Sequence, residues 1–122
     1  PLASPWSAAR LYRRAADQGD ANGQCNLGVM YQNGTGVPQD HAEAARQYRR
    51  AADQGDADGQ YNLGVMYANG TGVPQDYTEA ARLLKLADDQ GHPSARKILG
   101  VLTAQCPAGT RSGLRASPPP PT

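Results

Sequence analysis

Aromatic and sulfur-containing residues are scarce in this chain of 122 residues. It has no phenylalanine, one tryptophan and two cysteines, and 39% of its residues are hydrophobic. A single deep core is hard to build from so little bulky apolar volume. The cysteines, Cys25 and Cys106, are too few for a disulfide framework, and we expect both to be free thiols.

Charge of one sign and long apolar runs are also missing. The net charge is +1, so bulk charge attracts neither nucleic acid nor acidic substrates. No apolar run approaches the ~20 residues of a membrane span. We therefore expect no nucleic-acid partner and no membrane insertion. The chain begins with Pro1 rather than Met, and we interpret it as a piece of a longer product, so its localisation stays unknown.

The sequence does have a long internal repeat. Residues 15–50 and 51–86 align without a gap and differ at nine of 36 positions. Gly28 recurs at the same spacing as Gly64 and Gly100. A period of this length indicates stacked units of supersecondary structure, each too small to bury its apolar face alone.

The first half of each unit has the pattern of a helix. Asp20 is placed to cap its start, and Leu27 and Tyr31 follow at helical spacing. Asn33-Gly34 is expected to end it, because both residue types tolerate positive φ. Glycine inside a helix costs about 1 kcal/mol relative to alanine. The recurring Gly28 position therefore predicts a partner helix so close that a Cβ would collide with it.

The second half of each unit has the pattern of another helix. Asp40 and Glu43 stand at capping-box spacing, and Gly55 fits the residue after the helix end. The six predicted helices span about 5–18, 21–32, 41–54, 57–68, 77–90 and 93–105. The pattern fails from Pro107, and we expect residues 107–122, rich in proline and glycine, to be disordered.

The motif LGVMYxNGxGVPQD, followed by EAAR and AADQG, resembles the Sel1-like repeat over residues 4–106. The resemblance implies an all-α fold: a short right-handed superhelix of antiparallel helix pairs, with about two complete repeats flanked by half repeats. It also implies an adaptor or scaffold that binds a protein or peptide. The chain departs from the family at Gly23 and Gly59, where most members have alanine, which suggests slightly weaker helices. Its cysteines also lack the close pairing of the cysteine-rich subgroup.

By analogy with tetratricopeptide solenoids, one stripe of the first helices should line a concave, partner-binding face. We call these ten residues the concave stripe: Asn22, Cys25, Val29, Gln32, Asp58, Tyr61, Val65, Ala68, Lys97 and Val101. Within the first helix the two full copies differ at 22/58, 25/61 and 32/68, all on this stripe. Either recognition or drift of exposed positions explains this, and the two readings stay open. Tyr61 beside Val65 is the best anchor, since aromatic residues dominate interfaces.

Other signals point away from chemistry. Arg13, Arg49 and Lys85 form a basic ladder, but each has an aspartate four residues later, so we expect a solvated outer face. No nucleophile–base pair, carboxylate pair or metal-ligand cluster emerges from the spacing. We predict no catalytic residue, metal or cofactor, and a protein-binding module. The alternative is a structural spacer or a segment that self-associates through its more apolar last complete repeat; an enzyme ranks below both.

Overall fold

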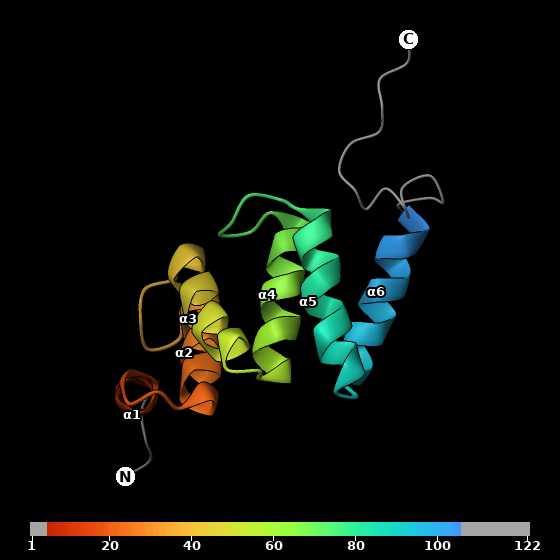
Figure 1. Ribbon diagram of the computed structural model, residues 1–122. Helices are drawn as coiled ribbons and strands as arrows, with labels where there is room; N and C mark the ends of the chain where they lie inside the picture. The colour runs from red at the N-terminus through yellow and green to blue at the C-terminus, as the bar shows by residue number, and fades with distance from the viewer. Residues whose placement is uncertain (1–4, 106–122) are drawn as a thin grey trace.

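The computed structural model describes residues 5–105, and these residues form helices without any strand. The helices lie in a row, with α1 at one end and α6 at the other (Figure 1). Their bounds are α1 Pro5–Asp17, α2 Ala21–Asn33, α3 His41–Asp53, α4 Ala57–Asn69, α5 Tyr77–Asp89 and α6 Pro93–Gln105. Each helix packs mainly on the helix before it and the helix after it. Helices two apart in the sequence, such as α2 and α4, touch only at a few points. This is the architecture of a helical-repeat solenoid.

Aspartate caps start four of the helices, as predicted. The carboxylates of Asp20 and Asp56 accept the backbone N–H groups of Gly23 and Gly59 at 2.8 Å. Asp40 likewise accepts the N–H of Glu43 at 3.1 Å. The reciprocal half of a capping box is replaced, because the Asp40 N–H donates to the Tyr31 carbonyl at 2.9 Å. The second helix of a unit is thereby tied to the end of the first.

Glycine alone ends the first helices, which corrects the expected role of asparagine. Gly34 has φ 72° and Gly70 has φ 71°, and each N–H bonds to the helix carbonyl four residues earlier. Asn33 and Asn69 remain the last helical residues, and no non-glycine residue of the described chain has positive φ. The first helices of the complete units therefore extend one residue further than the sequence suggested.

Close helix packing explains the recurring interior glycines. A Cβ on Gly28 would lie 2.7 Å from the Tyr48 ring, and one on Gly64 would lie 2.9 Å from Leu84. Both distances are shorter than real contacts, so the prediction of a partner helix at this position is confirmed in α2 and α4. A Cβ on Gly100 of α6 would meet nothing within 4 Å.

Successive units are joined by a second set of close contacts. A Cβ on Gly23 would lie 2.6 Å from that of Ala15 and 2.9 Å from the Ala16 nitrogen, across the α1–α2 junction. Gly59 repeats this closeness against α3. Gly23 and Gly59, where most family members have alanine, therefore permit tight packing between units. This packing comes at the cost of the lower helix propensity of glycine.

The basic ladder takes part in the same junctions, which corrects the prediction of a wholly solvated face. The Arg13 guanidinium bonds to the Tyr31 hydroxyl and lies 5.7 Å from the ring centroid. Arg49 makes the same pair with Tyr67, at 5.6 Å. Only Lys85 pairs as expected, with Asp89 at 3.4 Å. The first two rungs of the ladder therefore join one unit to the next.

Two sequence predictions fall outside the described residues: the disorder of the proline-rich segment 107–122 and the free thiol of Cys106. Cys25 is a free thiol. No helix in residues 5–105 is long and apolar enough to cross a membrane.

Candidate protein-binding surface

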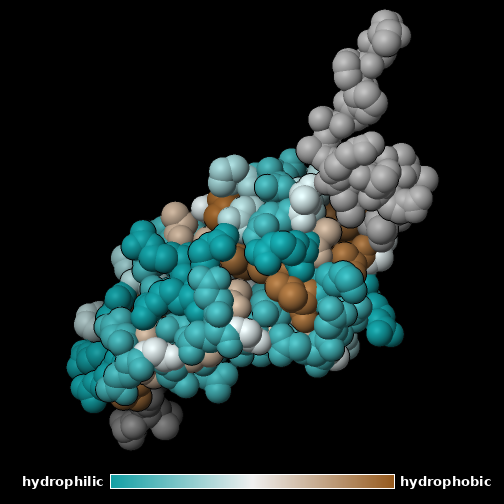
Figure 2. Space-filling view, in the orientation of Figure 1, coloured by the Kyte–Doolittle hydropathy of each residue, from teal (hydrophilic) through white to brown (hydrophobic). Residues whose placement is uncertain are grey.

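A hollow of about 400 Å³, lined by both apolar and polar side chains, lies between α4, α6 and the start of α5. Three residues of the concave stripe line it: Val65, Ala68 and Val101. The remaining lining residues are Asn69, Gln75, Tyr77, Ile98 and Leu102. In Figure 2 brown, apolar surface gathers over the half of the molecule that holds α4 to α6, while the α1 end is mostly hydrophilic.

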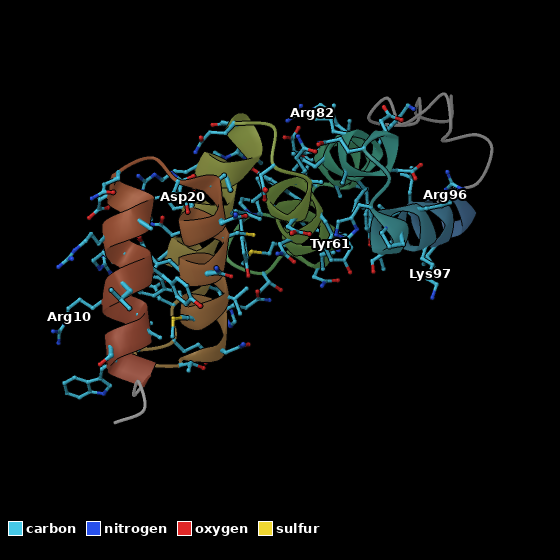
Figure 3. The ribbon with its side chains drawn as sticks, turned by 90° about the horizontal axis from the view of Figure 1, so that it is seen from below. Arg10, Asp20, Tyr61, Arg82, Arg96 and Lys97 are labelled. Carbon is cyan, nitrogen blue, oxygen red and sulfur yellow. The ribbon has the colours of Figure 1, made fainter. Side chains whose placement is uncertain are left out.

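Tyr61 does not line this hollow and is engaged within the solenoid. Its ring stacks on His92, with centroids 4.5 Å apart and an interplanar angle of 17°. Both nitrogens of the His92 ring also have partners. Nε2 lies 3.1 Å from the Asp58 carboxylate, and Nδ1 accepts the Ala95 N–H. Figure 3 shows Tyr61 on the side of α4 that faces α6. Tyr61 therefore holds α4 to the start of α6 and is only half-buried.

Cys25 does not belong to the accessible surface, which corrects its place in the stripe. It is 8% exposed and belongs to the core cluster formed by α2, α3, α4 and α5. The Asn62 amide donates to its sulfur at 3.8 Å. Burial, together with the charge of Asp56, raises the pKa of this thiol to about 12. A thiol so rarely ionised is a poor nucleophile.

Gln32 is turned toward its own unit. Its side-chain oxygen accepts the Tyr48 hydroxyl at 2.7 Å, and its backbone carbonyl accepts the Gln39 amide at 2.8 Å. Ala68 replaces it in the second unit, where Leu84 replaces Tyr48 and needs no acceptor. The Gln32 position therefore serves internal hydrogen bonding in one unit and lines the hollow in the other.

The other stripe residues are exposed without forming one site. Asn22, Val29 and Lys97 each face solvent, and in Figure 3 Lys97 projects away from the helix row. Val101 is 51% exposed at the rim of the hollow. The structure brings together the α4 and α6 members of the stripe and leaves the α2 members apart.

Sequence reasoning missed the lining residues Ile98, Leu102 and Tyr77. Ile98 stands where the complete units have Asn26 and Asn62, and an apolar residue at a polar repeat position was a usable signal. Tyr77 is one of the nine positions at which the two copies differ, and it aligns with His41 of the first copy. Leu102 carried no such signal, because it takes the ordinary core place of a methionine.

The described residues offer no group of three or more His, Cys, Asp or Glu side chains placed to hold a metal ion. Burial is the chief cause that raises the pKa values of Cys25 and Tyr48, and the hydrogen bond between Glu79 and Arg82 lowers the pKa of the first and raises that of the second. None of them lines the hollow. What the hollow offers chemically is a set of aliphatic side chains together with two amides and a phenol.

Known proteins share both the sequence pattern and the fold. The model of the Sel1 repeat matches residues 7–20, 21–56 and 57–92. A Sel1 repeat protein from Oxalobacter formigenes is 33% identical, with a TM-score of 0.79 over 84% of this chain and 42% of its own. A protective antigen of uropathogenic Escherichia coli is 36% identical, with a TM-score of 0.80 over 89% of this chain and 22% of its own.

A third solved structure, Helicobacter pylori cysteine rich protein B, is 31% identical, with a TM-score of 0.71 over 75% of this chain and 68% of its own. A search of curated proteins finds no match. The chain spans less than half the length of the first two solved relatives. The repeat model covers most of the chain: its first match falls on α1, and the other two follow the helix pairs α2–α3 and α4–α5. The chain belongs to the Sel1 repeat family.

Proposed function

We propose that this solenoid is a protein-binding module that holds an apolar segment of its partner in the hollow between α4 and α6. The observation that carries the proposal is the clustering of Val65, Ala68 and Val101 around one hollow. Sel1 repeats are in general protein–protein interaction modules without chemistry of their own. We propose no catalytic role for this chain.

The size and lining of the hollow favour a small apolar anchor over a flat contact. A hollow of about 400 Å³ accommodates one or two large side chains, and interfaces concentrate their affinity in such pockets. The amides of Asn69 and Gln75 and the hydroxyl of Tyr77 at its edge supply hydrogen bonds for the backbone of a bound peptide. An exposed partner loop or helix with a leucine, phenylalanine or methionine fits this arrangement.

A capture experiment with matched variants tests the proposal. Val101→Glu puts a charge into the rim of the hollow without disturbing a buried residue. Leu86→Glu makes the same kind of change on α5, at a site that is 40% exposed and does not line the hollow. Tyr61→Ala is a poor choice, because it removes the stack on His92.

We expect the native chain and Leu86→Glu to retain the same partner in pull-downs analysed by mass spectrometry, and Val101→Glu to lose at least about tenfold in affinity, or ~1.4 kcal/mol. Circular dichroism should show equal helix content in all three. Equal capture by all three would place binding elsewhere. A native chain that retains no specific partner would favour the structural-spacer alternative.

A further inference from the structure

The residue that caps α6 differs in kind from the residues that cap the other first helices. Asp20 and Asp56 cap α2 and α4, and each carboxylate accepts the backbone N–H three residues later at 2.8 Å. The 36-residue period places His92 at the same position before α6. Its ring nitrogen Nδ1 accepts the Ala95 N–H at 3.2 Å. An imidazole therefore replaces the capping carboxylate at the start of α6.

The protonation state of the His92 ring follows from its two hydrogen-bond partners. A backbone N–H is always a donor, so Nδ1 must offer a lone pair to Ala95 rather than a hydrogen. The neutral ring then has its hydrogen on Nε2, which lies 3.1 Å from the Asp58 carboxylate of α4. The side chain is 15% exposed, and its ring is stacked on Tyr61 of the same helix. The neutral ring therefore links α4 to the first turn of α6.

A second proton on the ring is compatible with only one of these two hydrogen bonds. An Nδ1–H group would face the Ala95 N–H, donor against donor. The positive charge would also stand at the N-terminus of α6, where the helix dipole disfavours cations. The Asp58 carboxylate would instead attract the charged ring. Protonation therefore draws the ring toward α4 and away from the capping position of α6.

The other charged groups around His92 do not replace the lost bond. Asp88 of α5 lines the same hollow at the α5–α6 turn, but its carboxylate is paired with Arg96 at 3.1 Å. Arg96 and Lys97 line this hollow from α6, and both are exposed. They have the same sign of charge as the protonated ring, and neither accepts hydrogen bonds. The first turn of α6 is therefore left without its cap when the ring is charged.

We propose that His92 is a pH-sensitive cap, which holds the start of α6 to α4 when it is neutral and releases it when it is protonated. Histidine side chains change charge between about pH 5 and 8, whereas aspartates do so near about pH 4. The first turn of α6 therefore loosens in a pH range in which α2 and α4 keep their caps. Because α4 and α6 touch only at a few points, the loss of one link weakens the whole contact.

The loosened turn leads directly into the hollow between α4 and α6. Ile98, Val101 and Leu102 follow on the same helix and line that hollow. The shape of the hollow would thus depend on pH, whether or not a partner binds there. The proposal concerns only the cap of α6, so it stands or falls separately from the proposed function.

Nitrogen-15 NMR of the full chain tests the proposal, because it observes the ring and the capped amide in one sample. At about pH 7.5 we expect His92 to have a bare Nδ1 and a protonated Nε2, and at about pH 5 two protonated nitrogens. Exchange of the Ala95 N–H with solvent, relative to an unfolded peptide at the same pH, should become about tenfold faster over this range through loss of the cap. The Gly59 N–H is the internal control, since it has the same repeat position and is capped by Asp56.

Two variants separate the ring of His92 from other effects of acid. His92→Asn supplies a cap that takes up no proton, so its Ala95 N–H should stay equally protected at both pH values. His41→Asn changes the only other histidine of the chain and should respond to pH as the native chain does. The comparison of Ala95 with Gly59 in the native chain holds even where a variant folds poorly.

The proposal is overturned if Nδ1 of His92 carries a hydrogen at the higher pH, or if exchange of the Ala95 N–H does not accelerate as the pH falls. An equal acceleration at Gly59 also overturns it, because the whole chain would then be loosening in acid. So does an equal acceleration in His92→Asn, since a group other than the ring would be responsible.

Discussion

Residues 21–56, which hold α2 and α3, and residues 57–92, which hold α4 and α5, share 25 of 36 aligned residues, and several of their differences come in partnered sets. The first unit has Tyr48 with Gln32 to accept its hydroxyl, and the second has Leu84 with Ala68. A buried hydroxyl without an acceptor is costly, so a change at one position requires a change at the other. The units therefore differ as packed pairs rather than as independent surface positions.

The same holds for the other two stripe positions that differ. Tyr61 stacks on His92 at the start of α6, whereas the smaller Cys25 accepts a hydrogen bond from Asn62 of α4. Asp58 bonds to His92, and the repeat offset places Asn22 opposite Asp56, where a second carboxylate would add repulsion. Packing against the following unit is a third explanation for the variation, besides recognition and drift. Variation between copies alone does not identify a binding surface.

The burial of Cys25 is the difference between the two units whose test has the largest expected effect. With its pKa raised from 9.0 to about 12, the Cys25 thiol at pH 8 is ionised about 1000-fold less than an ordinary thiol. In a Cys106→Ser background, we expect Cys25 to react with Ellman's reagent at least that much more slowly when folded than in urea. The rate of colour development measures this directly. A folded rate close to that in urea would return Cys25 to the accessible stripe.

The interior glycines test whether the two units are packed alike and α6 differently. We expect Gly28→Ala to destabilise the fold by about 2 kcal/mol, because the added methyl collides with the Tyr48 ring. Gly64→Ala should cost less, since its nearest contact is the flexible Leu84. Gly100→Ala should instead stabilise by up to about 1 kcal/mol through helix propensity.

Urea unfolding followed by circular dichroism measures all three variants. Gly100→Ala is the control, because it makes the same chemical change at the same repeat position, where the added Cβ meets no atom within 4 Å. A loss of stability in Gly100→Ala equal to that in Gly28→Ala would show that α6 is covered as α2 is.

Most of this fold was predictable from sequence, because the residues that start and end each helix are close together in the sequence and occur in both repeats. Capping aspartates, the glycine that follows each first helix and the 36-residue period fix the helices before any long-range contact is known. The site was harder, since its members depend on which neighbour a helix meets. Val65 and Val29 are the same residue at the same repeat position, yet only Val65 faces the hollow, because α6 presents Ile98 where α4 presents Asn62. No local pattern around Val65 contains that information.

The Gln32–Tyr48 hydrogen bond can be measured as a coupled pair. Tyr48→Phe and Gln32→Ala should each destabilise by about 1 kcal/mol, and the double variant by little more than either alone. The coupling energy from a double-mutant cycle in urea gives the value of the bond. Additive losses would mean that the two positions vary independently, and would reopen recognition as the cause of the difference at 32/68.

The smallest expected difference concerns the acidic residue three places after each second-helix cap. Glu79 is held by Arg82, whose Nε lies 3.0 Å from it, while Glu43 lies 3.4 Å from Arg46 and also accepts the Gln47 amide at 2.8 Å. The Arg82 guanidinium keeps the pKa of Glu79 below its ordinary value of 4.5. Because the folded pKa is the lower one, this stabilisation is complete above the unfolded pKa. It is lost as pH falls through the folded pKa.

Glu79→Gln should therefore cost only about 0.3–0.5 kcal/mol at pH 7, as expected for an exposed pair on one helix. The difference from the native chain should vanish in strong acid. Urea midpoints measured between pH 7 and pH 3 test both statements, with Glu43→Gln as the matched change in the other unit. No loss of the difference on acidification would mean that Glu79 acts through packing rather than charge, and the two units would then be alike at this position.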